Sequence, residues 1–145
     1  MAKVLIKKLD PSVKIPSYKT VGASGMDIMA FIQKPIIIKS NTSSIIPTGL
    51  CVAFSQEYEI QIRPRSGLAA KNNISVLNTP GTIDSDYRGE IKVILYNHGN
   101  NDFTVNNSDR IAQMILTPVI KVELEETNNL PETIRGEGGF GSTGK

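Results

Sequence analysis

The sequence contains very few of the residues that build common catalytic and metal centres. Among its 145 residues there is one cysteine, Cys51, one histidine, His98, and no tryptophan. A single cysteine excludes a disulfide bond within the chain, and one cysteine with one histidine cannot form a Cys/His zinc cluster. Ser-His-Asp or Cys-His catalysis would have to use His98, whose Asn-His-Gly-Asn-Asn surroundings are typical of a solvent-exposed loop. We expect Cys51 to be a small core residue.

Long apolar runs and clusters of positive charge are missing as well. No apolar stretch approaches the roughly 20 residues of a membrane-spanning helix, and the Met1-Ala2-Lys3 start is not that of a signal peptide. The formal net charge is +2, and Lys7-Lys8 is the only adjacent basic pair. This is not the charge pattern of a nucleic-acid-binding surface. We therefore expect a cytoplasmic protein that binds neither nucleic acid nor a membrane.

β-branched residues, in contrast, are abundant. The chain has nineteen isoleucines and nine valines, and its 12 glycines and 8 prolines separate short apolar runs. No long stretch has the 3.6-residue period of a helix. A chain of this length forms one domain and buries roughly 68–70% of its unfolded surface, so it can build a core without disulfides. Together these features predict an all-β sandwich or a jelly-roll-like barrel.

Short alternating or continuous apolar segments predict the individual strands. The clearest alternation puts Ile91, Val93 and Leu95 on one face of a half-buried strand. The predicted strands lie at residues 4–9, 35–39, 43–47, 49–54, 57–63, 74–77, 90–96, 103–105 and 110–115.

The stretch 81–97, GTIDSDYRGEIKVILYN, combines strand signals with a polar turn. Two β-segments joined by Ser-Asp-Tyr-Arg-Gly predict a hairpin that carries Asp84, Asp86 and Tyr87 at its bend. A carboxylate on a rigid support can deprotonate a water molecule, and a nearby ring can form one wall of a ligand site. The alternative is an ordinary turn, since Asp, Ser and Gly are common turn residues.

A second polar stretch follows the strand predicted at 57–63. Pro64 ends that strand, and Ser66 and Gly67 begin one or two helical turns. Free N–H groups, a hydroxyl, a glycine and the Arg65 guanidinium would form an anion-binding cradle. The alternative is a capped helix with exposed arginines. All five arginines lie in segments suspected of binding a ligand, which favours phosphate binding.

Three more polar residues stand next to apolar ones, and each has two interpretations. Asp27 lies between Met26 and Ile28 and is either a turn-capping group or a carboxylate of the site. Asn78 is a turn residue or an amide that reads the edge of a base. Gln113 lies among apolar neighbours and needs a partner, either a backbone group or a ligand.

The C-terminal sequence from Arg135 to Lys145 cannot pack a core. It contains five glycines, one aromatic residue, Phe140, and the hydroxyls of Ser142 and Thr143. Such a segment is either a disordered end or an arm that becomes ordered over a ligand. In the second case the ring stacks on a base, and the guanidinium and hydroxyls bind phosphate oxygens. The glycine spacing does not match a Walker phosphate-binding loop.

Taken in order, these segments resemble the five motifs of the homotrimeric deoxyuridine triphosphatases. Five motifs at these spacings are highly specific, and the resemblance covers the chain from Gly22 to Gly144. Met26 stands where the family usually has an aromatic residue. The matching sequences are GASGMDI, PRSGLA, GTIDSDYRGEIKVILYN, RIAQMI and RGEGGFGSTG.

The resemblance implies a jelly-roll-like β-barrel subunit in a homotrimer with shared active sites. The expected barrel domain covers residues 1–130, and residues 131–145 form a mobile arm that closes over an active site. The implied activity is Mg²⁺-dependent hydrolysis of dUTP to dUMP and pyrophosphate. Such an activity limits uracil incorporation into DNA and supplies dUMP for thymidylate synthesis.

The resemblance also implies a role for particular residues. Asp84 is the general base that activates a water for attack on the α-phosphorus, and Asp27 holds a metal ion through water. Tyr87 excludes a ribose 2′-hydroxyl, and Phe140 closes over uracil. The implied substrate-binding residues are Arg65, Ser66, Gly67, Asn78, Thr82, Ile83, Asp84, Tyr87, Lys92, Gln113, Arg135, Phe140, Gly141, Ser142 and Thr143.

Two other functions are compatible with such a barrel. A dCTP deaminase has a similar fold, but the sequence offers no separate deamination site. A non-catalytic barrel that binds nucleotide and signals to a partner belongs to a different class. Such a protein has little need for a base, a metal carboxylate and a closing arm together.

Overall fold

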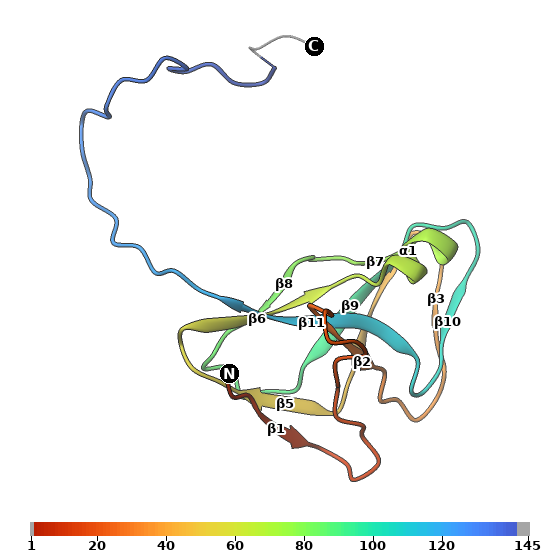
Figure 1. The fold of residues 1–145 in the computed structure, drawn as a ribbon. Helices are drawn as coiled ribbons and strands as arrows, with labels where there is room; N and C mark the ends of the chain where they lie inside the picture. Colours follow the sequence, from red (N-terminus) through yellow and green to blue (C-terminus); the bar gives the residue numbers. More distant parts are fainter. Residues whose placement is uncertain (1, 142–145) are drawn as a thin grey trace.

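The computed structural model describes residues 2–141 and confirms the all-β fold (Figure 1). Eleven short strands and one helix make up the regular structure of these residues. The strands are β1 (Leu5–Lys8), β2 (Met26–Met29), β3 (Ile36–Ile38), β4 (Ser43–Pro47), β5 (Leu50–Ala53), β6 (Tyr58–Arg63), β7 (Ile74–Val76), β8 (Gly81–Ile83), β9 (Lys92–Asn97), β10 (Phe103–Val105) and β11 (Arg110–Pro118), and the helix is α1 (Ser66–Asn72).

The strands form four antiparallel sheets, which together make a jelly-roll-like barrel. The largest has the order β2-β11-β6-β8, and a three-stranded sheet has the order β4-β9-β7. Two pairs, β1-β5 and β10-β3, complete the barrel. β11 lies inside the largest sheet, where it pairs with β2 on one side and β6 on the other.

The core contains the apolar faces of nearly every strand. In β9 the side chains of Val93 and Leu95 are buried, whereas Lys92 is exposed and Ile94 is only partly covered, so the predicted alternation is confirmed. The buried cluster comprises Ile28, Ala30, Ile32, Ile38, Ile46, Val52, Ile60, Ile62, Ile74, Val76, Ile91, Val93, Leu95, Val105, Ile111, Ala112 and Met114.

The hairpin predicted within residues 81–97 is wrong. β8 pairs with β6, with Ile83 opposite Ile60, whereas β9 pairs with β4 and β7. The residues between β8 and β9 therefore carry the chain from one sheet to another. The Ile91 N–H, just before β9, donates to the Leu50 carbonyl of β5 at 2.8 Å. Two adjacent strand signals do not specify that the strands pair with each other.

The short helix predicted after Pro64 is confirmed as α1. Asn73 follows it in a left-handed conformation, and its backbone N–H donates to the Ala69 and Leu68 carbonyls at the helix end. None of the residues of α1 is fully buried, although Leu68 packs against the core. The start of α1 at Ser66 therefore remains accessible.

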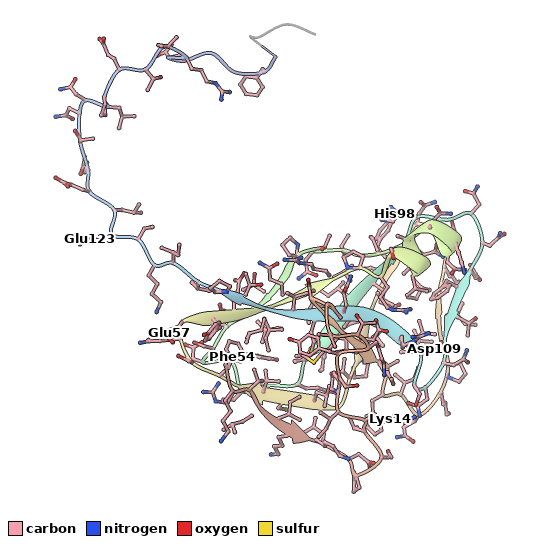
Figure 2. All side chains as sticks on the ribbon, viewed as in Figure 1. Lys14, Phe54, Glu57, His98, Asp109 and Glu123 are labelled. Atoms are coloured by element: carbon pink, nitrogen blue, oxygen red, sulfur yellow. The ribbon has the colours of Figure 1, made fainter. Side chains whose placement is uncertain are left out.

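The predicted burial is wrong for the lone cysteine and confirmed for the lone histidine. Cys51 is only half-buried, because in β5 it is Leu50 and Val52 that point into the core. The prediction of a core cysteine is therefore wrong. His98 is exposed, as expected, and lies near α1 (Figure 2). Its Nε2 is 2.7 Å from the Ser75 hydroxyl.

The C-terminal part of the chain leaves the barrel after β11. The Val119 N–H donates to the Glu57 carbonyl at 2.8 Å. Beyond this point, residues 120–141 contain no strand or helix and extend away from the body (Figure 1). Glu123 lies on this extended segment, well separated from the barrel (Figure 2). Among residues 2–141, no helix is long and apolar enough to cross a membrane.

Candidate active site

A pocket of about 280 Å³ lies where β8 ends and β9 begins. Two sheets fix the two sides of this pocket, since β8 is bonded to β6 in one and β9 is bonded to β4 and β7 in the other. Five of the residues predicted to bind substrate line it, together with one that was not predicted. The lining residues are Thr82, Ile83, Asp84, Tyr87, Glu90 and Lys92.

Asp84 is the first residue after β8, so the sheet positions its backbone. Its side chain is exposed, and within residues 2–141 its carboxylate forms no hydrogen bond or ion pair. Its backbone carbonyl accepts a hydrogen bond from the Tyr87 N–H at 3.1 Å, which closes a tight turn. The carboxylate oxygens are therefore available to accept a proton from a water molecule in the pocket.

Tyr87 is held on several sides although it is not buried. Its hydroxyl donates to the Glu90 carbonyl at 3.0 Å. The Arg88 guanidinium donates to the carbonyls of Ser85 at 2.7 Å and Tyr87 at 3.1 Å. The first bond holds the Tyr87 side chain and the other two hold the backbone of the turn. The ring therefore forms a defined wall of the pocket.

Glu90 is a pocket residue that the sequence did not reveal as functional. Its carboxylate accepts a hydrogen bond from the Gly49 N–H at 2.9 Å and lies 4.0 Å from the Lys92 ammonium. Glu90 thereby connects the turn to the start of β5 and keeps a positive charge beside the pocket. In the sequence, the alternation of residues 90–96 predicted only that Glu90 lies on the face opposite Ile91, Val93 and Leu95.

Asn78 lies close to the same pocket. A smaller cavity of about 30 Å³ is lined by Asn78 and also by Thr82, Ile83 and Lys92, which it shares with the main pocket. The Asn78 amide packs over Gly81, where a Cβ atom would stand 3.2 Å from Nδ2. A donor and an acceptor are thus present beside the pocket, as reading the edge of a base requires.

A second cluster of predicted residues surrounds Asp27 on β2. The Asp27 carboxylate accepts a hydrogen bond from Arg65 Nε at 2.8 Å and lies 3.4 Å from an Arg110 terminal nitrogen. The Arg65 guanidinium also donates to the Arg110 carbonyl at 3.3 Å. Asp27 is partly buried and forms charge-assisted bonds, so it orients the Arg65 donors. Arg110 was not predicted as a site residue, although it begins the fourth motif.

Gln113 joins this cluster from β11. It stands opposite Asp27 on one neighbouring strand and opposite Arg63 on the other. Its amide nitrogen donates to the Pro64 carbonyl at 3.0 Å, so the partner in this structure is a backbone group. Its other amide atom lies above Gly25, where a Cβ would come within 2.8 Å. Gln113 thereby supports the loop that carries Arg65.

Ser66 and Gly67 continue from Arg65 into α1 and are both exposed. A Cβ placed on Gly67 would meet nothing within 4 Å, so the space in front of it is open. An anion can approach the backbone here next to the oriented guanidinium.

The pocket at Asp84 and the cluster at Asp27 are far apart on one chain. β2 and β8 are opposite edges of the four-stranded sheet, three strand spacings or roughly 14 Å apart. Ile83 lies opposite Ile60, three residues along β6 from Arg63, which adds roughly 10 Å along the strands. The separation of roughly 17 Å is well beyond direct contact.

The C-terminal residues form a third group that is remote from both others. Arg135 donates to the Gly138 carbonyl at 2.7 Å within a local turn. Phe140 is fully exposed, and Gly141 is the last residue that the structure describes. Ser142 and Thr143 were also predicted to bind substrate, and they lie outside the described residues.

The residues around Asp27 suit a magnesium ion only if the substrate supplies most of the ligands. Among residues 2–141, no group of three or more His, Cys, Asp or Glu side chains has metal-site geometry. Asp27 offers one carboxylate, and two arginines already contact it. Magnesium keeps several waters and is commonly bound by one or two carboxylates plus phosphate oxygens. This donor set therefore fits contact through water.

The structure places a carboxylate-bearing pocket on a jelly-roll-like barrel. Its fold is that of the dUTPase of Staphylococcus bacteriophage 80alpha, solved with dUPNHPP, at a TM-score of 0.87, 21% identity and 99% coverage of both chains. A mutant dUTPase of phage phi11 of S. aureus, solved to reveal the coordination of a structural Mg(II) ion, has a TM-score of 0.80 at 17% identity, with 90% of this chain and 99% of that chain covered. At these identities the likeness concerns the fold alone.

Sequence comparison identifies the family. The dUTPase family model matches residues 11–144. The chain is 52% identical over 145 residues to the deoxyuridine 5'-triphosphate nucleotidohydrolase of Rickettsia bellii, with 99% of this chain and 97% of the relative covered. It is 49% identical to the protein of the same name from Fusobacterium nucleatum, with both chains fully covered. The chain belongs to the dUTPase family.

Proposed function

We propose that this chain hydrolyses dUTP to dUMP and pyrophosphate in a magnesium-dependent reaction. The observation that carries the proposal is the pocket lined by the fixed Tyr87 ring and by the Asp84 carboxylate, which has no partner within residues 2–141. A base next to an aromatic wall suits attack on a nucleotide bound through its sugar and base. The names of the relatives support the substrate, since all of those cited act on deoxyuridine triphosphate by name.

In the proposed reaction Asp84 accepts a proton from a water molecule as that water attacks the α-phosphorus. The carboxylate has no competing protein partner among the described residues, and its backbone is fixed at the end of β8. A positioned general base contributes about 10²–10⁴-fold to the rate. The larger part of the acceleration must come from groups that stabilise charge on the phosphates.

Selection of deoxyuridine is assigned to the walls of the same pocket. The Tyr87 ring would lie against the deoxyribose and leave no room for a 2′-hydroxyl. Asn78 and the backbone from Thr82 to Asp84 would read the uracil edge and refuse the thymine methyl. Ile83 and Lys92 line the pocket beside them. Close packing of these walls supports the assignment, because the cavity next to Asn78 holds only about 30 Å³.

Phosphate binding is assigned to Arg65, Ser66, Gly67 and Gln113. The two contacts that Arg65 makes with Asp27 and Arg110 support this role, because they hold the guanidinium in place while Nη2 makes no hydrogen bond within residues 2–141. A bound Mg²⁺ would neutralise phosphate charge, with Asp27 holding its waters. Arginine donors add bidentate contacts that fix the phosphate chain in line with the attacking water.

The active site is proposed to be shared between subunits of a homotrimer. Asp84 and Arg65 must both reach one nucleotide, yet the end of β8 and Asp27, which holds the Arg65 guanidinium, are roughly 17 Å apart on one chain. A cyclic trimer brings the Asp84 side of one subunit to the Arg65 side of the next. The exposed alternation of Ile120, Val122 and Leu124 further supports assembly, since these apolar side chains stay uncovered on their own subunit.

Mixing two inactive variants tests the shared site. Asp84→Asn and Arg65→Ala chains are each expected to be nearly inactive alone. Unfolding and refolding them together in equal amounts should restore about a quarter of wild-type activity, because that share of neighbouring pairs combines two intact halves. The readout is pyrophosphate release by the mixture beside each variant refolded alone. A mixture no more active than the variants would place the whole site within one subunit.

The segment 131–145 is proposed to be a mobile arm that closes over the site, while residues 1–130 form the catalytic barrel. Arg135 would bind the γ-phosphate and Phe140 would cover uracil, with Gly141, Ser142 and Thr143 following along the nucleotide. The support is the exposure of Phe140 together with the lack of regular structure in residues 120–141. In the cell the reaction would limit uracil in DNA and supply dUMP for thymidylate synthesis. A cytoplasmic location stays a prediction from sequence.

Pyrophosphate release from dUTP with magnesium is the direct test of the proposed function. Parallel reactions contain dTTP, dCTP and UTP, and dCTP samples are also assayed for ammonia. We expect fast release from dUTP alone. Release from several nucleotides would contradict the assigned selectivity. Tight dUTP binding without hydrolysis would indicate a binding protein, and ammonia from dCTP would indicate a deaminase.

A further inference from the structure

Gly89 lies directly against the ring of Tyr87. A Cβ atom placed on Gly89 would overlap the Tyr87 hydroxyl oxygen and would stand 2.5 Å from Cζ and 2.9 Å from Cε2. Optimal carbon–carbon contacts are 3.5–4.0 Å. The smallest possible side chain at this position would therefore collide with the ring in its present place.

The backbone does not require glycine here. In the part of the chain that the structure describes, the glycines with positive φ are Gly49, Gly136 and Gly141. Gly89 is not one of them, so its φ lies outside the left-handed region that favours glycine. The three atoms nearest to a Cβ at position 89 all belong to the Tyr87 side chain, so the bare Cα of Gly89 makes room for that side chain.

The ring cannot move without breaking other contacts. Its hydroxyl donates to the Glu90 carbonyl, and the backbone of Tyr87 is held by the Asp84 carbonyl and the Arg88 guanidinium. Glu90 is in turn anchored through its carboxylate to the Gly49 N–H. Because the Tyr87 side chain is 44% exposed, core packing does not hold it. The turn and the bare Cα of Gly89 set its position.

We propose that Gly89 is a specificity-determining positioning residue, which sets how deep the Tyr87 ring lies in the pocket and so the preference for a deoxyribose over a ribose. The inference rests on the proposed dUTPase activity. Gly89 itself touches no substrate, and it acts by leaving room beside its Cα for the tip of the Tyr87 side chain. A small shift of a wall residue changes which sugar fits, since sub-ångström placement governs reactivity.

The test compares Gly89→Ala with the wild-type chain on dUTP and on UTP, which differs by the 2′-hydroxyl. A pocket that rejects an added hydroxyl typically gains a roughly hundredfold preference in kcat/KM. We expect Gly89→Ala to lower the dUTP-to-UTP ratio of kcat/KM by about tenfold. The loss should come mainly from a higher KM for dUTP, because Asp84 is unchanged. Gly22→Ala is the matched control. A Cβ there meets nothing within 4 Å, and both the ratio and the KM should stay at the wild-type values.

A double-mutant cycle separates an action through the ring from a general disturbance of the turn. In a Tyr87→Ala background there is no ring to displace, so adding Gly89→Ala should change the ratio less than twofold. Additive effects of the two substitutions would overturn the inference, and so would a wild-type ratio in Gly89→Ala. A wild-type chain that does not hydrolyse dUTP would instead overturn the proposed function. Thermal melting of each variant verifies that the exposed turn, and not the fold, has changed.

Discussion

Asp84→Asn is expected to bind dUTP with nearly wild-type affinity and to hydrolyse it about 10²–10⁴-fold more slowly. The amide has the size and shape of the carboxylate but cannot take a proton from the attacking water at neutral pH. The rate should fall in kcat, because proton transfer occurs only in the chemical step. The dissociation constant, measured by calorimetry with a non-hydrolysable dUTP analogue and Mg²⁺, should change little.

The surroundings of Asp84 make this substitution easy to interpret. Its carboxylate has no hydrogen-bond or salt-bridge partner among residues 2–141, so replacement leaves no buried group unpaired. Its contact with Tyr87 uses the backbone carbonyl, which the variant retains. Stability and the position of the ring should therefore both be preserved.

Asp86→Asn is the matched control for Asp84→Asn. Asp86 belongs to the same turn and is also exposed, but it does not line the pocket. Its replacement removes the same charge from the same turn and should leave kcat within twofold of wild type. Full turnover by Asp84→Asn would remove Asp84 as the base. Equal losses in both variants would indicate a general effect of negative charge near the pocket.

Local patterns in the sequence predicted the barrel well because they depend on single strands. Burial of Val93 and Leu95 follows from a two-residue period, and the start of α1 follows from Pro64 and the residues after it. Which strands pair is a non-local property. The hairpin prediction failed for this reason, since Ile83 pairs with Ile60 and the next strand lies in another sheet.

The same distinction applies to the candidate site. Asp27, Asp84 and Arg65 were identified by residue type, whereas Glu90 and Arg110 were given no role because their roles depend on contacts across the fold. Glu90 reaches the Gly49 N–H, and Arg110 reaches Asp27 on a neighbouring strand. A sequence also does not give the separation of Asp84 from Arg65 on one subunit. That separation is the physical reason to expect assembly.

Deleting residues from Arg135 onward should lower kcat/KM for dUTP by at least about 10²-fold while the trimer stays intact. The deletion removes the proposed γ-phosphate ligand and the ring proposed to cover uracil. Loss of one preorganised donor to a transition-state charge costs about 10²–10³-fold, and an open site also readmits water. Size-exclusion chromatography with light scattering should give the wild-type mass.

The melting temperature should also be unchanged by this deletion. Arg135 bonds only within its own turn in the described chain, and Phe140 is fully exposed, so the barrel loses no packing. In the full-length chain, Arg135→Ala measures how much of the loss in kcat/KM comes from phosphate binding. Phe140→Ala measures how much comes from covering the uracil ring. Leu130→Ala is the control, because it changes an exposed apolar residue just before the proposed arm. A truncated trimer with full activity would mean that the C-terminal segment plays no part in catalysis.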